Sequence, residues 1–232
     1  MLLSRCEDHE MLIDTITDIL PMAAGIALSP IPIAAVVSIL LAADTRKASA
    51  FLLGWTTGIL AIGLLVLFIP GLRLINGDPT PLAGWLRVVL GGALLVVAWH
   101  KWQKRPAPES QLEEPKFLAK IDSYNGWKAL ILGVTLAVFN PKSFVFASAS
   151  AMTIYEAKIV GKEKAAVLIA FAVISSLSVG IPIVFTWARR DKAQQILEDL
   201  KDWLIANNTA VTVVLLVVFA MLIAGSGLKI VF

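Results

Sequence analysis

The triplet Asn140-Pro141-Lys142 places an amide, a backbone break and a charged amine side by side in an apolar stretch. Lys142 has thirteen uncharged residues on each side, 129–141 and 143–155. A helix of this length reaches roughly 40 Å and can cross a bilayer. A lysine at the centre of such a span costs about 2.5–3.5 kcal/mol, and the proline removes a backbone donor. Because lipid offers no hydrogen bonds, both need partners inside the protein, which indicates a working site at this depth.

Lys142 has two readings. Its ammonium group can bind the phosphate, sulfate or carboxylate of an anionic headgroup, or it can carry a proton. The alternative is a structural lysine, satisfied by backbone carbonyls that the proline breaks leave free. Asn140 can donate and accept across the break, either in a site or as a helix cap. Backbone amides freed in a broken helix also favour anions, so we predict substrate binding at Lys142 and Asn140.

A second break, Ser29-Pro30-Ile31-Pro32, lies at the midpoint of the first long uncharged run. Two prolines in mid-span are incompatible with a regular helix. Each break is followed by two further apolar spans, so the second half repeats the first in inverted orientation. Matched broken helices in inverted halves are typical of the central site of a transporter. We therefore predict that Ser29 binds substrate and that Pro30, Pro32 and Pro141 shape the site, although prolines are also common in membrane helices.

Composition places the chain among integral helical membrane proteins. Its 232 residues are 58% hydrophobic and only 16% charged, with a mean hydropathy of +0.80, whereas soluble domains carry about 25% charge. We predict an all-α membrane fold of two inverted three-helix repeats, residues 1–103 and 126–232, joined by a polar cytoplasmic linker, 104–125. An interfacial amphipathic helix is expected near 190–206. The six predicted spans cover residues 15–43, 48–69, 81–102, 126–155, 165–188 and 208–232, the first and fourth being broken.

Other polar residues near the predicted spans give weaker indications. Thr56 and Thr57 could line a polar substrate path, or they could simply bond to backbone one turn earlier. They lie within Gly54-Trp55-Thr56-Thr57-Gly58, whose GxxxG spacing permits close helix packing and is compatible with a homodimer. Asp44 and Glu156 end the two broken spans at opposite membrane faces. They could serve a gate or ion coupling, or they could be ordinary solvated helix ends.

Charge distribution predicts the orientation. The loops after spans 1, 3 and 5 and their flanks hold twelve Lys and Arg residues, against six on the other side. The positive-inside rule therefore puts both termini outside the cytoplasmic (inner) membrane of a bacterium. We expect no enzyme, cofactor or metal site and no nucleic-acid partner. The single cysteine, Cys6, excludes a redox pair, no metal-ligand spacing joins the two histidines, and there is no GxxxxGK[ST] nucleotide loop.

Two ordered motifs carry a family resemblance. They are Gly25-Ile-Ala-Leu-Ser-Pro-Ile-Pro32 and Phe139-Asn-Pro-Lys-Ser143. With them the whole chain resembles the lysine exporter (LysE) superfamily, and within it the GAP family, the sulfolipid- or glycopeptidolipid-addressing proteins. The resemblance implies export of lipids or glycolipids. Ile31 replaces the glycine usual between the two prolines in the amino-acid exporters, which argues against an amino-acid substrate.

These observations together predict a membrane transporter that exports an anionic lipid or glycolipid and contacts membrane lipids. Its substrate would bind near the two breaks and Lys142. The first alternative is an exporter of small amino acids or cations. The second is a non-transporting accessory scaffold for cell-envelope lipid assembly, in which Lys142 would be structural.

Overall fold

The computed structural model describes residues 2–68, 81–105, 121, 123–157, 159, 161–188 and 190–231, which form eight α-helices. The all-α prediction is confirmed. In the described part of the chain, three helices are long and apolar enough to cross a membrane, or up to five if each bent pair is one span. Most of the predicted linker, 106–120 and 122, lies outside the described residues. The helices are α1 (Leu2–Ala27), α2 (Pro30–Leu41), α3 (Thr45–Phe68), α4 (Pro81–Gln103), α5 (Gly126–Val138), α6 (Pro141–Glu156), α7 (Gly161–Ala188) and α8 (Arg190–Val231).

Both predicted helix breaks are present. The axes of α1 and α2 are bent by 56° and those of α5 and α6 by 70°. Pro30 and Pro141 open α2 and α6, where the missing N–H of proline costs nothing. Pro21 and Pro182 lie inside α1 and α7, and those helices continue through them. In both breaks a polar residue precedes the proline, and serine and asparagine are favoured over leucine and isoleucine as the residue that starts a helix.

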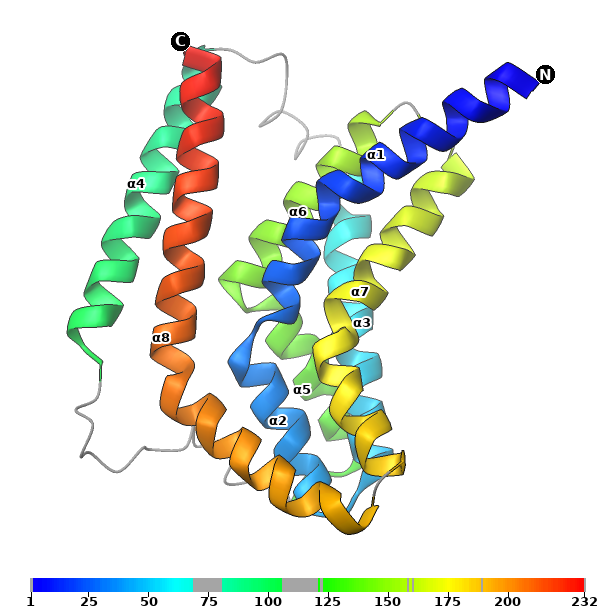
Figure 1. Ribbon diagram of the computed structural model, residues 1–232, viewed down its shortest axis with the longest axis vertical. Coiled ribbons are helices and arrows are strands. Elements are labelled where there is room, and N and C mark those ends of the chain that lie inside the picture. Colours follow the sequence, from blue (N-terminus) through cyan, green and yellow to red (C-terminus); the bar gives the residue numbers. More distant parts are fainter. Residues whose placement is uncertain are drawn as a thin grey trace.

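The two broken pairs run in opposite directions through one bundle (Figure 1). The path from α1 to α2 descends in this view, and the path from α5 to α6 ascends. The helix α3 packs against α5, and α1 packs against α7. The start of α1 and the end of α8 lie at the same end of the molecule (Figure 1). The broken helices thus cross the bundle antiparallel to each other, with their breaks halfway along.

Glycines hold α3 and α5 together backbone to backbone. A Cβ atom at Gly54 would collide with the carbonyl oxygen of Leu130, and one at Gly133 with the carbonyl oxygen of Phe51. One turn on, a Cβ at Gly58 would lie 2.7 Å from that of Ala137. The predicted close approach at the GxxxG spacing is therefore made inside the chain. These glycines face α5, so they are not free to contact a second copy of the protein.

The C-terminal region departs from the expected two helices, because 190–206 and 208–232 belong to one helix, α8. Residues 206–209 read Ala-Asn-Asn-Thr and contain no proline or glycine that would end a helix. Figure 1 shows that α8 first runs across the lower end of the bundle, then bends and continues beside α4. In the crossing part, Ala193, Leu197 and Leu204 are buried, as expected for an amphipathic helix on the bundle.

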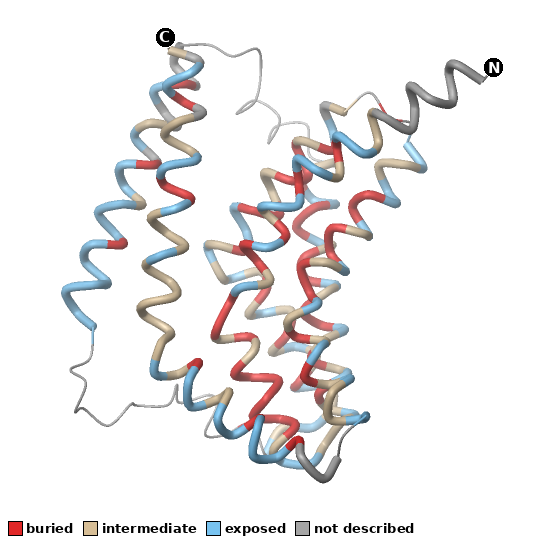
Figure 2. The backbone as a smooth tube through the Cα atoms, in the orientation of Figure 1, coloured by how far each residue is buried: buried red, intermediate tan, exposed pale blue. Residues whose placement is uncertain are grey.

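Burial is concentrated in the broken pairs, α3 and α7 (Figure 2). Trp55, Phe51 and Phe171 are the largest fully buried side chains, and they come from α3 and α7. The helix α4 and the second part of α8 pack against each other; α4 is largely exposed elsewhere, and the second part of α8 is mainly of intermediate burial (Figure 2). The molecule therefore has a tightly packed core around the breaks, with the α4–α8 pair at its side.

Candidate functional site

Lys142 joins the two helix breaks. Its Nζ donates to the carbonyl oxygen of Leu28 at 3.4 Å. In a continuous helix that carbonyl would accept from the N–H four residues later, but residue 32 is a proline and has none. The lysine of one break therefore supplies the hydrogen bond that the prolines of the other break remove. Both breaks were predicted from the sequence, and the structure brings them into contact.

The residues that precede the two prolines behave differently. Asn140 is the N-cap of α6, and its Oδ1 accepts from the backbone N–H of Lys142 at 3.0 Å. Ser29 is the N-cap of α2, but its side chain makes no capping bond. Its hydroxyl is buried and finds no partner in the described part of the protein. Asn140 thus fixes the start of α6, whereas Ser29 keeps a donor available at the break.

Further buried polar groups lie at the breaks and about two helical turns away, where the backbone N of Trp55 is next to Gly133 and Ser176 contacts Thr56. Trp55 of α3, Ser143 of α6 and Ser175 of α7 are fully buried. Among the described residues, the Trp55 Nε1 and both hydroxyls have no hydrogen-bond partner. An unpaired buried polar group costs about 1–3 kcal/mol, so such groups point to a ligand or water in the working protein. Trp55 and Ser143 were missed as site residues, because a serine or tryptophan in an apolar run gives no signal of its own.

The two predicted threonines separate. The Thr56 hydroxyl lies 2.9 Å from the Ser176 hydroxyl of α7, which in turn donates to the carbonyl of Ala172 at 2.7 Å. Thr56 thus belongs to a polar contact between α3 and α7. Thr57 is exposed, and its hydroxyl donates to the carbonyl of Leu53 at 2.8 Å, one turn earlier on its own helix. The structure therefore places Thr56 in the bundle and Thr57 on its outside.

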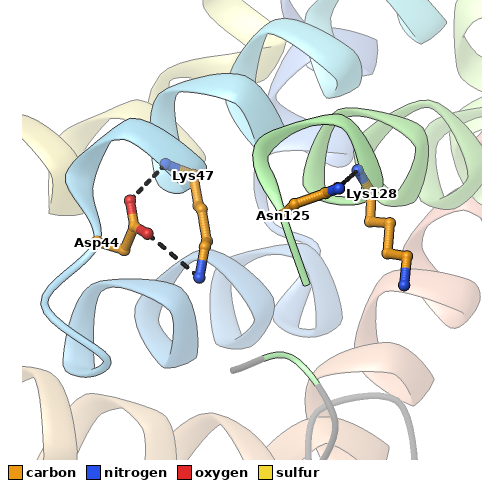
Figure 3. Close-up of polar contacts among 4 residues, drawn as sticks. All are labelled: Asp44, Lys47, Asn125 and Lys128. Atoms are coloured by element: carbon orange, nitrogen blue, oxygen red, sulfur yellow. Dashed lines mark hydrogen bonds and ion pairs between the residues drawn. The ribbon is translucent and has the colours of Figure 1, made fainter. Parts of the chain in front are cut away.

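Asp44 lies away from the breaks and caps α3 (Figure 3). Its Oδ1 accepts from the backbone N–H of Lys47 at 3.0 Å, and its Oδ2 lies 3.2 Å from the Lys47 ammonium. The backbone N–H of Lys47 holds the pKa of Asp44 below its ordinary value. Asn125 caps the neighbouring α5 in the same way, accepting from the N–H of Lys128 at 2.9 Å (Figure 3). This geometry gives Asp44 a capping role, while the side chain of Glu156 lies outside the described residues.

The breaks can be reached from outside the bundle. Leu28 is 56% exposed and Phe139 is 79% exposed, and each immediately precedes a capping residue. No three metal-ligating side chains gather in the part of the chain that the structure describes. The chemistry on offer is therefore one ammonium group, hydroxyl and amide donors, and the starts of two helices. This set suits a hydrogen-bond acceptor that carries negative charge.

The chain matches the sequence model of a known family. The sequence model of the family described as Sap, sulfolipid-1-addressing protein, matches residues 19–229. The matched range holds both helix breaks and Lys142. Comparisons with curated proteins and with solved structures give no match.

Proposed function

The chain belongs to the Sap, sulfolipid-1-addressing protein family, and from this premise we propose that it is a membrane transporter that exports an anionic lipid or glycolipid. The substrate headgroup binds at the two helix breaks, and Lys142 provides the positive charge. The protein acts in the cytoplasmic membrane, with both termini outside. It moves its substrate without a chemical step.

The contact between Lys142 and the carbonyl of Leu28 carries this proposal. Through it the charged residue of one break lies at the other break, so both can contact one headgroup. The helices α2 and α6 begin at the breaks, and their N-terminal amides and dipoles favour negative charge. The hydroxyls of Ser29 and Ser143 add donors that have no partner in the described chain. An anionic headgroup could replace the Leu28 carbonyl as the hydrogen-bond acceptor of Lys142. It could accept hydrogen bonds from the two serine hydroxyls at the same time.

The arrangement of the helices also supports a transporter. The three long apolar helices and the two bent pairs give up to five candidate spans, and we count α4 as the sixth. The second half then repeats the order of the first, a broken pair followed by two crossings, in the opposite direction. Transporters built from inverted repeats place their substrate between discontinuous helices at mid-membrane. The breaks, Lys142 and the hydroxyls of Ser29 and Ser143 lie halfway along the broken helices, where such a site is expected.

A reconstitution assay tests the function. Vesicles that contain the protein and a fluorescent sulfated glycolipid are treated with a membrane-impermeant quencher, which destroys only outward-facing fluorophores. We expect the wild type to move the glycolipid from the inner leaflet to the outer leaflet. The assay is run both with and without an imposed proton gradient. Lys142→Met should lose this activity, and a zwitterionic fluorescent lipid should not move. Equal movement of both lipids, or none above protein-free vesicles, would contradict the proposal.

One observation favours a second candidate, the accessory scaffold. Lys142 already has a backbone partner, as a purely structural lysine would. In that case Lys142→Met removes a costly charge from the apolar interior, and the protein should become more stable without any change in lipid binding. A transporter instead predicts that the same substitution weakens lipid binding, whatever it does to stability.

A further inference from the structure

An aromatic contact lies one helical turn beyond the Lys142–Leu28 contact. Phe146 follows Lys142 by four residues on α6, and Gly25, in the last turn of α1, precedes Leu28 by three residues. Residues three or four apart share a helix face, so both lie on the faces that form the break contact. Phe219 of α8 enters at the same level, with its ring centroid 3.9 Å from that of Phe146. A polar layer and an aromatic layer are therefore stacked along one seam.

The glycine at position 25 makes room for this aromatic layer. A Cβ atom there would lie 2.6 Å from Cζ of Phe219 and 2.7 Å from Cε2 of Phe146. The two rings are tilted by 52°, and both side chains are buried. Gly25 lies in the first break motif, but its partner on α8 is almost two hundred residues away in sequence. The layer closes the bundle at the place where α8 meets the broken helices.

Phe219 differs from its neighbours on α8. Val218 and Leu222 are exposed, and Ala220 packs on α4, where a Cβ at Gly91 would lie 2.7 Å from the Ala220 carbonyl oxygen. This part of α8 is therefore held backbone to backbone by α4. On the side that faces the broken helices, this part of α8 makes contact through the ring of Phe219. Side-chain contacts of this kind separate more easily than a glycine seam such as that between α3 and α5.

We propose that the seam between α8 and the α1–α6 pair is the exit for the hydrocarbon part of a bound lipid, and that Phe219 closes it in the empty protein. This inference rests on the proposed function. A lipid whose headgroup is at Lys142 must lead its acyl chains from the polar layer into the bilayer. The aromatic layer is one turn from Lys142, and displacement of the Phe219 ring opens a path directly to the exposed side of α8. The seam thus takes an acyl chain, while the breaks take the headgroup.

The test compares one headgroup on two hydrocarbon lengths. Binding of long-chain sulfatide and of the methyl glycoside of the same sulfated galactose is measured on purified protein. Phe219→Ala removes the aromatic contact that closes the seam, so this variant should bind the long-chain lipid roughly two- to tenfold more tightly than the wild type. This is the range expected for the loss of one aromatic pair. Binding of the methyl glycoside, which has no chain long enough to reach the aromatic layer, should not change. The exposed neighbour supplies the matched control, Val218→Ala, which should bind both ligands like the wild type.

A second variant keeps the test decisive if Phe219→Ala folds poorly. Phe146→Cys and Phe219→Cys are combined in a Cys6→Ser background and joined by a short, reducible bis-thiosulfonate reagent. The cross-linked protein should lose the long-chain lipid and retain the methyl glycoside, and reduction should restore binding of the long-chain lipid. If Phe219→Ala binds the long-chain lipid like the wild type, and the cross-linked protein also binds it fully, then the seam is not the exit for the hydrocarbon chain. Wild-type binding of both ligands by Lys142→Met would instead refute the headgroup site, and so the proposed function.

Discussion

At the scale of single residues, the consequences of a proline appear four positions earlier in the chain. Pro32 has no N–H, so the carbonyl of Leu28 lacks its helical donor and accepts from Lys142. The same logic separates the two caps, since Asn140 uses its amide oxygen on α6 while Ser29 leaves its hydroxyl unused. The need of Lys142 for an internal partner could be predicted from its cost in an apolar span. The identity of that partner could not, because it depends on how α1 packs against α6.

Asp44 gives a residue-scale prediction with a defined pH dependence. Its lowered pKa means that the folded protein favours the carboxylate, so the stabilisation is present above the unfolded pKa of about 3.9 and is lost as pH falls through the folded value. Asp44→Ala should lower the free energy of unfolding by about 0.5–2 kcal/mol at pH 7, as for other N-caps. Unfolding of detergent-solubilised protein at pH 7, 5 and 3 measures this.

The control for Asp44 is Asp44→Asn, which keeps an acceptor for the N–H of Lys47 but has no charge to titrate. Its stability deficit should be smaller than that of Asp44→Ala and should vary less with pH. The difference between wild type and Asp44→Ala should shrink toward pH 3. A difference that grows on acidification would show that the carboxylate is not the cap.

At the scale of helices, the residue before a proline distinguishes the prolines at helix breaks from the prolines inside continuous helices. Pro30 and Pro141 follow Ser29 and Asn140 and start new helices, whereas Pro21 and Pro182 follow aliphatic residues and stay inside α1 and α7. The breaks were therefore predictable from short motifs. The continuity of α8 was not, because the change from amphipathic to uniformly apolar sequence near 207 resembles a helix end. The periodicity of apolar residues shows which face of a helix is buried, but it does not show where the helix ends, because a helix can bend without a break.

The glycine seam between α3 and α5 gives an element-scale prediction. Gly54→Ala should strongly destabilise the protein, because the new methyl group would overlap the carbonyl of Leu130 and force two backbones apart. The matched control is Gly92→Ala on α4, where no neighbouring atom lies within 4 Å of the position that the methyl group would take. There the change should be neutral or stabilising by up to about 1 kcal/mol, from helix propensity. Thermal unfolding in detergent compares the two, and equal effects would contradict the seam.

At the scale of the whole molecule, the helices divide into a core and a lateral pair. The broken pairs, α3 and α7 bury most of the large side chains, and α4 with the second part of α8 lies beside them (Figure 2). Hydropathy and motif placement predict the two broken pairs and their opposite directions. They do not predict the lateral pair or the Phe146–Phe219 contact, because nothing local in α8 marks Phe219 among many apolar neighbours.

Orientation in the membrane is the whole-molecule prediction. The crossing part of α8 lies at the end that carries the more basic loops, so we expect it on the cytoplasmic side. Gln194→Cys and Lys229→Cys report on the two ends, because both residues are exposed and lie near opposite ends of α8. In a Cys6→Ser background, an impermeant thiol reagent applied to intact spheroplasts should label position 229 and spare position 194. The reverse pattern would invert the proposed topology.

The proposed function depends above all on Lys142 holding an anionic headgroup at the meeting point of the two breaks, and native mass spectrometry of gently purified protein can detect that lipid. Hydrogen bonds to charged groups contribute about 1.5–3 kcal/mol, so Lys142→Met should lower retention of a specific anionic lipid by roughly tenfold or more. Lys128→Met, which removes an exposed lysine at the start of α5, should retain the lipid like the wild type. If wild type and Lys142→Met instead carry the same lipids in the same amounts, Lys142 is a structural lysine and does not hold the headgroup.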